Sequence, residues 1–209
     1  MLIVGAGGVA SQLFDDIITM KNVEFVFWSE TKTTHNCIKD HYKILQTDKE
    51  VLDYFACNSK SFVVGIWDIS ARKRLIKKFT NLGGELVSFI TPFSYLSSYT
   101  LVGKGSIIMH KAASEPDVII GENCIVNKRA NFGHGCIIAT NCSIGPYTII
   151  SSNAEVGENS FVGMGAIIQP KIKIGKNVII AAGAVITKNI PDKAVVSGVP
   201  GRIRFFKRE

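Results

Sequence analysis

A histidine between two glycines is the residue in this chain best suited to proton transfer. His134 follows Phe132-Gly133 and precedes Gly135, and the glycines leave space for a ligand beside the ring. A histidine imidazole titrates near neutral pH, so its neutral form can accept a proton from an attacking amine. An isolated surface histidine has no such role by default, and the sequence around His134 is what makes it a candidate general base.

A glycine-rich turn near the start of the chain has the spacing of a phosphate-binding loop. The apolar run Leu2–Val4 leads into Gly5-Ala-Gly-Gly-Val-Ala10, and a helical pattern follows at 11–20. In that arrangement the unpaired N–H groups of the helix N-terminus point at an anion. Glu30 follows a second apolar run and is placed to accept a hydrogen bond from a ribose hydroxyl. The candidate substrate-binding residues are Gly7, Gly8, Val9, Ser29, Glu30 and Gly65.

Strand and helix patterns alternate over the first ninety residues. We expect strands at 2–4, 23–28, 61–66 and 85–90, and helices at 11–20, 49–56 and 70–82. This alternation predicts a parallel sheet with crossover helices, a Rossmann-like α/β domain at 1–92. The glycine turn could be purely structural or could bind NAD. The domain is short and no dehydrogenase substrate domain follows, which favours a single nucleotide such as a nucleotide-activated sugar.

From residue 102 onward, a large apolar residue returns at every sixth position. Neither a helix nor an ordinary strand produces this period. A chain that turns a corner every six residues does, and three sides make one coil of a parallel β-helix at 93–209. All members of this six-residue frame except Ser114 are apolar. The members are Val102, Ile108, Ser114, Ile120, Val126, Phe132, Ile138, Ile144, Ile150, Val156, Val162, Ile168, Ile174, Ile180 and Ile186.

Two further positions of the six-residue repeat have a preferred residue type. The second is often glycine, which suits a corner that needs a positive φ or a close backbone approach. The fifth is mostly small, so we expect the first and fifth positions to face inward and the rest to face corners or solvent. Cys124, Cys136 and Cys142 fall on the fifth position and are expected to be small interior residues. His134 falls on the third position and is expected to face outward.

Composition sets limits on the class of protein. The chain has 209 residues, 46% hydrophobic and 20% charged, with a net charge of +7. No apolar run suggests a membrane span and no signal peptide is apparent. The basic residues are scattered, apart from 72–78, which we interpret as the solvated face of a helix, and the tail at 202–208. No nucleic-acid motif is present, and small anionic ligands explain the charge. The number of cysteines is odd and most of them are expected to be interior, which favours a cytoplasmic protein.

The combination resembles a known family. A small Rossmann-like domain with Gly-Ala-Gly-Gly, joined to hexapeptide repeats, is similar to the sugar acetyltransferases of the sialic acid O-acetyltransferase type. Its N-acetyltransferase branch acts on nucleotide-linked 4-amino-4,6-dideoxy sugars. The most specific stretches are Cys124-Ile-Val-Asn-Lys-Arg-Ala-Asn-Phe-Gly-His-Gly-Cys136 and the ending Val196-Ser-Gly-Val-Pro-Gly201. The resemblance implies a left-handed β-helix, acetyl-CoA as the donor, a UDP- or dTDP-linked amino sugar as the acceptor, a homotrimer and no metal.

The resemblance also implies roles for individual residues. His134 would be the general base, and a backbone N–H near Ser143 or Gly145 would stabilise the oxyanion. The family usually has an acid directly after this histidine, where this chain has Gly135. One coil earlier lie Glu115 and Asp117, and we expect one of them to orient His134. The expected acetyl-CoA contacts are Ser143, Gly145, Gly163, Met164, Ala182 and Gly183.

Three other functions are compatible with parts of the sequence. Sugar O-acetylation would use the same residues on a hydroxyl acceptor. A zinc-dependent carbonic anhydrase on hexapeptide repeats would need three histidine ligands, and the repeats offer only His110 and His134. A non-catalytic nucleotide-binding scaffold would explain why the acid after His134 is missing.

Overall fold

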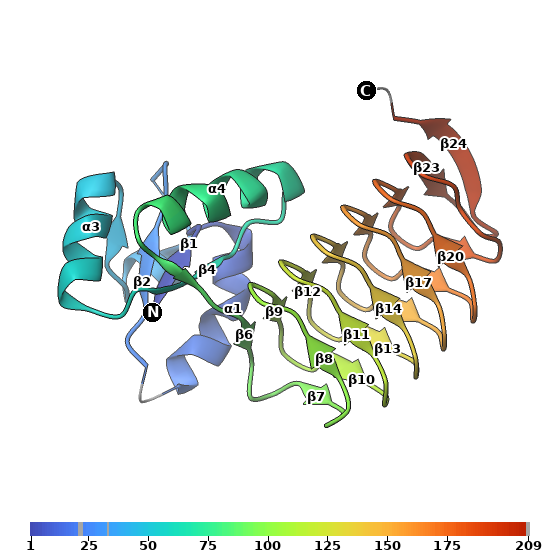
Figure 1. Cartoon of the computed structure of the whole chain (residues 1–209), viewed down its shortest axis with the longest axis horizontal. Helices are drawn as coiled ribbons and strands as arrows, with labels where there is room; N and C mark the ends of the chain where they lie inside the picture. Colours follow the sequence, from blue (N-terminus) through green and yellow to red (C-terminus); the bar gives the residue numbers. More distant parts are fainter. Residues whose placement is uncertain (21–22, 33, 208–209) are drawn as a thin grey trace. The chain divides into compact units, whose positions relative to one another are not determined.

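The computed structural model describes residues 1–20, 23–32 and 34–207, so Arg208 of the basic tail lies outside the described residues. The chain divides into two compact units, Met1–Phe89 and Ile90–Glu209 (Figure 1). No helix among the described residues is long and apolar enough to cross a membrane.

The first unit is built on a five-stranded sheet with the order β3-β2-β1-β4-β5, in which all neighbouring strands are parallel. The strands are β1 (Leu2–Val4), β2 (Val26–Trp28), β3 (Ile44–Leu45), β4 (Ser61–Val64) and β5 (Glu85–Leu86). The helices are α1 (Gly8–Thr19), α2 (Asn36–Lys39), α3 (Asp48–Cys57) and α4 (Ile69–Asn81). The chain leaves β1 in one direction for β2 and β3 and returns on its other side at β4. This reversal creates the switch point at which α/β sheets bind ligands, outside the carboxyl ends of the strands.

Two parts of this unit differ from expectation. The four-residue helix α2 and the two-residue strand β3 were not expected, because such short elements show no periodicity. The strand expected at 85–90 is two strands, β5 and β6 (Phe89–Ile90), and β6 belongs to a different sheet.

The basic run at 72–78 is not simply a solvated helix face, so that expectation was wrong for part of it. Arg72 is fully buried, and its Nη1 donates to the carbonyl oxygens of Ile66 (3.0 Å) and Trp67 (3.2 Å). The loop after β4 leaves these carbonyls without strand partners, and the guanidinium satisfies them. Lys78 pairs with Asp48 at 2.7 Å, so this part of α4 serves packing and charge pairing within the unit.

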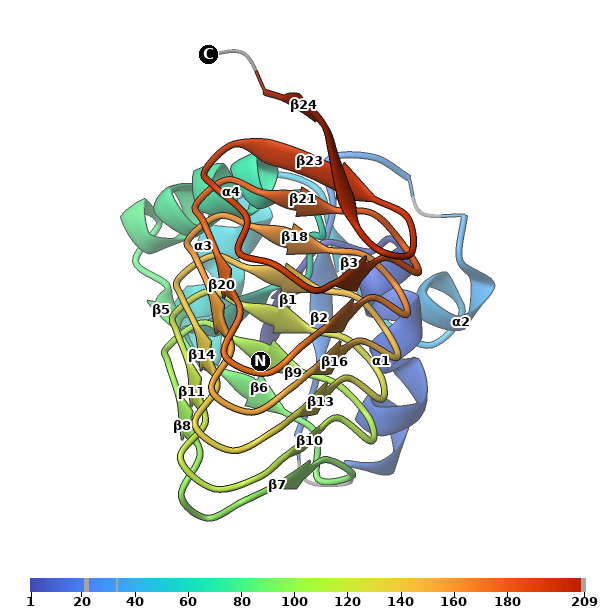
Figure 2. The same ribbon diagram turned by 90° about the vertical axis from the view of Figure 1, so that its right-hand side faces the viewer.

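The second unit is a parallel β-helix whose short strands stack in three columns (Figure 2). We name the columns by one member each. The β13 sheet contains β7 (Tyr95–Leu96), β10 (Ala113–Ser114), β13 (Asn131–Phe132), β16 (Ile149–Ile150), β19 (Ile167–Ile168) and β22 (Val185–Ile186). The β14 sheet contains β8 (Leu101–Val102), β11 (Ile119–Ile120), β14 (Ile137–Ile138), β17 (Glu155–Val156) and β20 (Lys173–Ile174).

The third column, the β15 sheet, is the longest. It runs from β6 through β9 (Ile107–Ile108), β12 (Ile125–Val126), β15 (Ser143–Ile144), β18 (Phe161–Val162) and β21 (Ile179–Ile180). It ends in β23 (Ala194–Ser197) and the antiparallel β24 (Arg202–Phe206). The ladders join residues one coil apart, as in Asn131 opposite Ile149.

The inward positions expected from the repeat are confirmed. From Ile108 to Ile186 every frame residue except Ser114 is at most 3% exposed, and the small fifth-position residues are also buried. Ser114 lies near the first coil, where its hydroxyl bonds the Thr100 hydroxyl at 2.6 Å. The frame also extends one side earlier than expected, because Leu96 packs against the same core.

The repeat glycines serve close approach and not a positive φ. A Cβ on Gly121 would lie 2.8 Å from Ala139 C and Thr140 N, backbone atoms of the next coil. The positive φ falls two residues later, on the fourth position, which is often asparagine as at Asn123 and Asn141. Asparagine tolerates this left-handed conformation better than most side chains. The corners therefore use glycine where two coils approach closely and often asparagine where φ is positive.

The interior cysteines also donate hydrogen bonds. The Cys136 thiol points at the Ser151 carbonyl oxygen at 3.1 Å, and Ser160 makes the equivalent bond from its hydroxyl to Gly175 at 2.9 Å. Burial raises the pKa of the Cys136 thiol, which keeps it protonated and able to donate.

Replacing Cys136 by alanine is therefore expected to lower the free energy of unfolding by about 1 kcal/mol, the usual net value of one hydrogen bond. Cys136→Ser should keep the donor and lie closer to the wild type. Urea denaturation of the two variants checks this, and equal losses in both would show that the thiol acts only by filling space.

Candidate functional site

His134 stands at an edge of the prism where the β13 sheet meets the β14 sheet. We call this the His134 edge, made of the corners 97–100, 115–118, 133–136, 151–154 and 169–172. His134 is exposed, as its third position in the repeat predicts. The six-residue period alone predicted that the His134 side chain faces outward, and the structure confirms this direction.

The main chain of His134 is held from both neighbouring coils. Glu115 Oε2 accepts a hydrogen bond from the His134 N–H at 2.8 Å, and Asn153 N–H donates to the His134 carbonyl oxygen at 2.9 Å. Gly135 has a φ of +67°, and a Cβ there would lie 2.5 Å from Asn153 Oδ1. An acidic side chain at 135 would therefore be strained and would displace Asn153.

The two acids expected near His134 lie at different places. Glu115 bonds the backbone of His134 and not its ring. Asp117 occupies the positive-φ position of its corner, at φ 63°, and no hydrogen bond joins it to His134 within the described residues. Of the two, Glu115 is the one that the structure connects to the candidate base.

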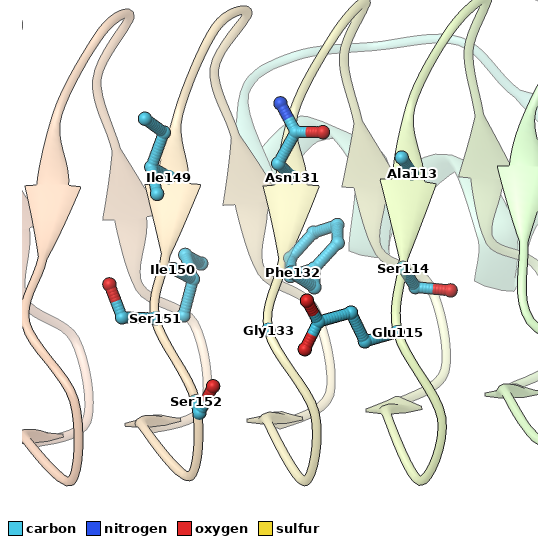
Figure 3. Close-up of a pocket in the computed structure, with 10 residues that line it drawn as sticks. All are labelled: Ala113, Ser114, Glu115, Asn131, Phe132, Gly133, Ile149, Ile150, Ser151 and Ser152. Carbon is cyan, nitrogen blue, oxygen red and sulfur yellow. The ribbon is translucent and has the colours of Figure 1, made fainter.

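A shallow pocket lies beside this corner. It has a volume of about 450 Å³ and is lined by β10, β13, β16 and the residues after them. Figure 3 shows the Glu115 side chain reaching from its own coil toward Gly133 of the next. Its lining includes Gly133 of the His134 corner, together with Glu115 of the preceding coil and Ser152 of the following coil. The pocket therefore adjoins the corner that carries His134.

Removing the Glu115 side chain is expected to lower kcat about tenfold or more, because a small displacement of a catalytic group has large effects on rate. Glu115→Gln keeps an acceptor for the His134 N–H and should retain most of kcat. Steady-state rates of Glu115→Ala and Glu115→Gln check this. Asp117→Asn, which removes the charge and suits the positive φ at this position, is the matched control, and an equal loss in it would contradict the selective role of Glu115.

The expected acetyl-CoA residues gather at another edge. The Gly163 edge joins the β15 sheet to the β13 sheet and consists of the corners 109–112, 127–130, 145–148, 163–166 and 181–184. Five of the expected contacts lie on it, namely Gly145, Gly163, Met164, Ala182 and Gly183. Ser143 lies on β15 and is fully buried.

The expected oxyanion donors are already used. Ser143 N–H donates to the Ser160 carbonyl oxygen at 3.0 Å, and Gly145 N–H donates to that of Val162 at 2.7 Å. The N–H groups at third positions, by contrast, do not enter the ladders. The third-position N–H groups of Ser152, Met164 and Ala182 are examples: within the described residues they have no main-chain acceptor, so they are available as donors.

The glycine turn of the first unit has the geometry of an anion site. Gly7 is the N-cap of the twelve-residue helix α1, and no side chain caps this end. A Cβ on Gly7 or Gly8 would meet nothing within 4 Å, so the space beside the turn is open. Val9 is buried and packs 3.4 Å from where a Cβ on Gly65 would lie, which assigns these two residues to packing beneath the turn.

The carboxylate expected to reach a ribose already has a partner. Arg74 donates two hydrogen bonds to Glu30, at 3.0 and 3.3 Å. These bonds lower the pKa of Glu30 and keep it ionised. Ser29 N–H donates to Leu45 at the end of the sheet, and its hydroxyl accepts from Thr31. Glu30 and Arg74 together present a hydrogen-bond acceptor and a donor just beyond the carboxyl end of β2.

Comparisons with known proteins agree with this geometry. Residues 1–79 match the PglD N-terminal domain, and 117–152 and 153–188 match the bacterial transferase hexapeptide repeats. The first unit thus matches a PglD N-terminal domain, and most of the second unit matches hexapeptide repeats. The expected fold, an α/β domain followed by a left-handed parallel β-helix, is confirmed. No curated protein matches the sequence.

Solved structures of two acetyltransferases are similar over nearly the whole chain. Perosamine N-acetyltransferase of Caulobacter crescentus, in complex with CoA and GDP-perosamine, is 26% identical with a TM-score of 0.86 over 98% of this chain and 96% of its own. The acetyltransferase domain of PglB from Neisseria gonorrhoeae, with acetyl coenzyme A, is 25% identical with a TM-score of 0.86 over 97% of each chain. WeeI from Acinetobacter baumannii, at 22% identity and a TM-score of 0.85 over 97% and 98%, shares the fold.

The described residues contain no group of three or more histidine, cysteine, aspartate or glutamate side chains arranged to hold a metal ion.

Two residues to which the sequence assigned no role lie close to His134 along the chain, Lys128 and Arg129. They take the third and fourth positions of the hexad before it, and that register was the signal available in the sequence.

Proposed function

We propose that this protein transfers an acetyl group from acetyl-CoA to the amine of a nucleotide-linked 4-amino-4,6-dideoxy sugar, within the sialic acid O-acetyltransferase type of sugar acetyltransferases. The observation that carries the proposal is the near full-length similarity to a sugar N-acetyltransferase solved with CoA and a GDP-linked amino sugar. The net charge of +7 suits two anionic substrates.

Each unit has its part in the reaction. The first unit binds the nucleotide, with the phosphate next to the nucleoside at the glycine turn Gly7-Gly8 and the N-terminus of α1. Glu30 and Arg74 contact the nucleoside. The second unit carries the chemistry at His134.

His134 acts as the general base. Its imidazole accepts a proton from the sugar amine while the nitrogen attacks the thioester carbon. The new N–C bond forms to give a tetrahedral intermediate, its collapse breaks the C–S bond, and the departing CoA thiolate takes up the proton from the His134 imidazolium. A free third-position N–H, such as that of Ser152, stabilises the developing oxyanion. Glu115 positions His134 through the main chain.

The donor site requires a second copy of the chain. Acetyl-CoA lying along the Gly163 edge is separated from His134 of the same chain by the β13 sheet. Five residue-to-residue steps of extended chain, from 129 to 134, span up to about 17 Å. In a homotrimer the Gly163 edge of one copy faces the His134 edge of the next, and the thioester reaches the imidazole.

Two measurements test this function. Thermal shift with UDP-, dTDP- and GDP-linked sugars identifies the nucleotide, since a bound ligand raises apparent stability. CoA release with the matching amino sugar then reports turnover. Nucleotide binding without any CoA release would favour a non-catalytic scaffold and contradict the proposal.

A further inference from the structure

The Gly163 edge carries a basic cluster at one end, made of Lys111, Lys128 and Arg129. Lys111 and Arg129 are exposed and Lys128 is partly exposed. Arg129 is held in place by Tyr147, because its Nη1 donates to the Tyr147 hydroxyl at 2.7 Å and its guanidinium lies 5.3 Å from the ring centroid. A guanidinium has five N–H donors, so most of them remain available to an anion. The cluster is therefore a partly preorganised anion-binding surface.

The His134 edge carries the opposite charge at the same levels of the prism. Lys111 precedes β10, and the exposed Glu115 and Asp117 follow it. Lys128 and Arg129 precede β13, and His134 follows it. These two coils thus have a basic corner at one end of the strand and an acidic or catalytic corner at the other.

Symmetry brings the two edges together. Rotation about an axis parallel to the prism leaves the level of every residue unchanged, and a closed ring places one surface against a different surface of the next copy. Lys111 of one copy then faces Glu115 and Asp117 of the next, which is a favourable charge pairing. At the next level, Lys128 and Arg129 face His134. This step rests on the homotrimer of the proposed function.

We propose that Lys128 and Arg129 bind the sugar-side phosphate of the nucleotide sugar whose amine reacts at His134 of the neighbouring copy, while the phosphate next to the nucleoside is held at the glycine turn. In a nucleotide-linked 4-amino sugar only the sugar ring separates the diphosphate from the reacting amine. The pyrophosphate of acetyl-CoA is a whole pantetheine arm away from the thioester. Phosphate oxygens at the level of His134 therefore belong to the acceptor, and arginine is the side chain that binds them with two parallel hydrogen bonds.

Kinetics of Arg129→Ala and Lys128→Ala test the ligand. We expect KM for the nucleotide-linked amino sugar to rise about 10- to 100-fold, as for lost hydrogen bonds to a charged group, while KM for acetyl-CoA changes little. Lys104→Ala removes the same charge from an exposed corner of the third edge and should leave both constants unchanged. An unchanged KM for the sugar, or an equal rise for acetyl-CoA, would overturn the assignment.

Mixed trimers test whether the contact crosses between copies. His134→Ala and Arg129→Ala chains are unfolded together, refolded, and assayed at low concentrations of the nucleotide sugar. Interfaces that join His134 of one copy to Arg129 of another should recover about a quarter of the wild-type rate, since random mixing pairs them in about one interface in four. No gain over the separate proteins would place Arg129 in its own copy's site and overturn the proposal. Absence of turnover by the wild type would instead overturn the proposed function, and this inference with it.

Discussion

Replacing His134 by alanine is expected to lower kcat by about 10²- to 10⁴-fold, the usual contribution of a positioned general base. KM for both substrates should change little, because the imidazole acts in the transition state more than in binding. The exposed ring leaves the fold intact when it is removed, since the corner is held by main-chain bonds to Glu115 and Asn153.

The rate of CoA release by His134→Ala, compared with the wild type, measures this effect. His41→Ala is the control, because His41 lies in the first unit and its ring contacts Phe14. A His134→Ala rate within twofold of the wild type would remove His134 as the base. Positioning of the substrates would then account for the reaction alone.

Replacing Gly121 by alanine is expected to destabilise the β-helix by about 3 kcal/mol, at the upper end of ordinary overpacking. The added methyl group would lie 2.8 Å from Ala139 C and Thr140 N and 3.0 Å from Ile138 O. All three atoms belong to the backbone of the next coil, and they cannot move away without breaking the ladder between coils.

Gly165→Asn is the matched control for this effect. Gly165 has a φ of +66°, and a Cβ there would meet nothing within 4 Å. Asparagine already occupies this conformation at other corners, so the change should stay within about 1 kcal/mol. Urea denaturation at one protein concentration compares the two variants. A larger loss in Gly165→Asn than in Gly121→Ala would contradict our account of the corners.

The second unit was predictable in detail because its period is long and regular. The frame from Ile108 to Ile186 gave the interior, the direction of His134 and the burial of the three cysteines. The period also assigns His134 and Gly163 to different edges of the prism. The conformation of the corners was not predictable from glycine alone. Glycine marks both close approach, as at Gly121, and a positive φ, as at Gly135.

The first unit and the charged contacts were less accessible from sequence. The side chain of Arg72 is buried because it binds carbonyl groups that the loop between β4 and α4 leaves unpaired, and no charge pattern in the sequence reveals such a need. The length of one coil identified Glu115 and Asp117 as alternative partners of His134, and the structure connects Glu115 to it. Its bond to the main chain depends on a side-chain rotamer, which spacing does not determine. The pairing of Glu30 with Arg74 joins residues far apart in sequence and required the packed helix α4.

The product of the reaction tests the central claim most directly. The wild type is incubated with acetyl-CoA and the nucleotide-linked 4-amino-4,6-dideoxy sugar that stabilises it most, and the product is analysed by mass spectrometry before and after mild base. We predict a gain of one acetyl group that survives base treatment, as an amide does, and that is absent with His134→Ala. An acetyl group lost in base would show transfer to a hydroxyl, and no acetylated product with any nucleotide amino sugar would contradict the account.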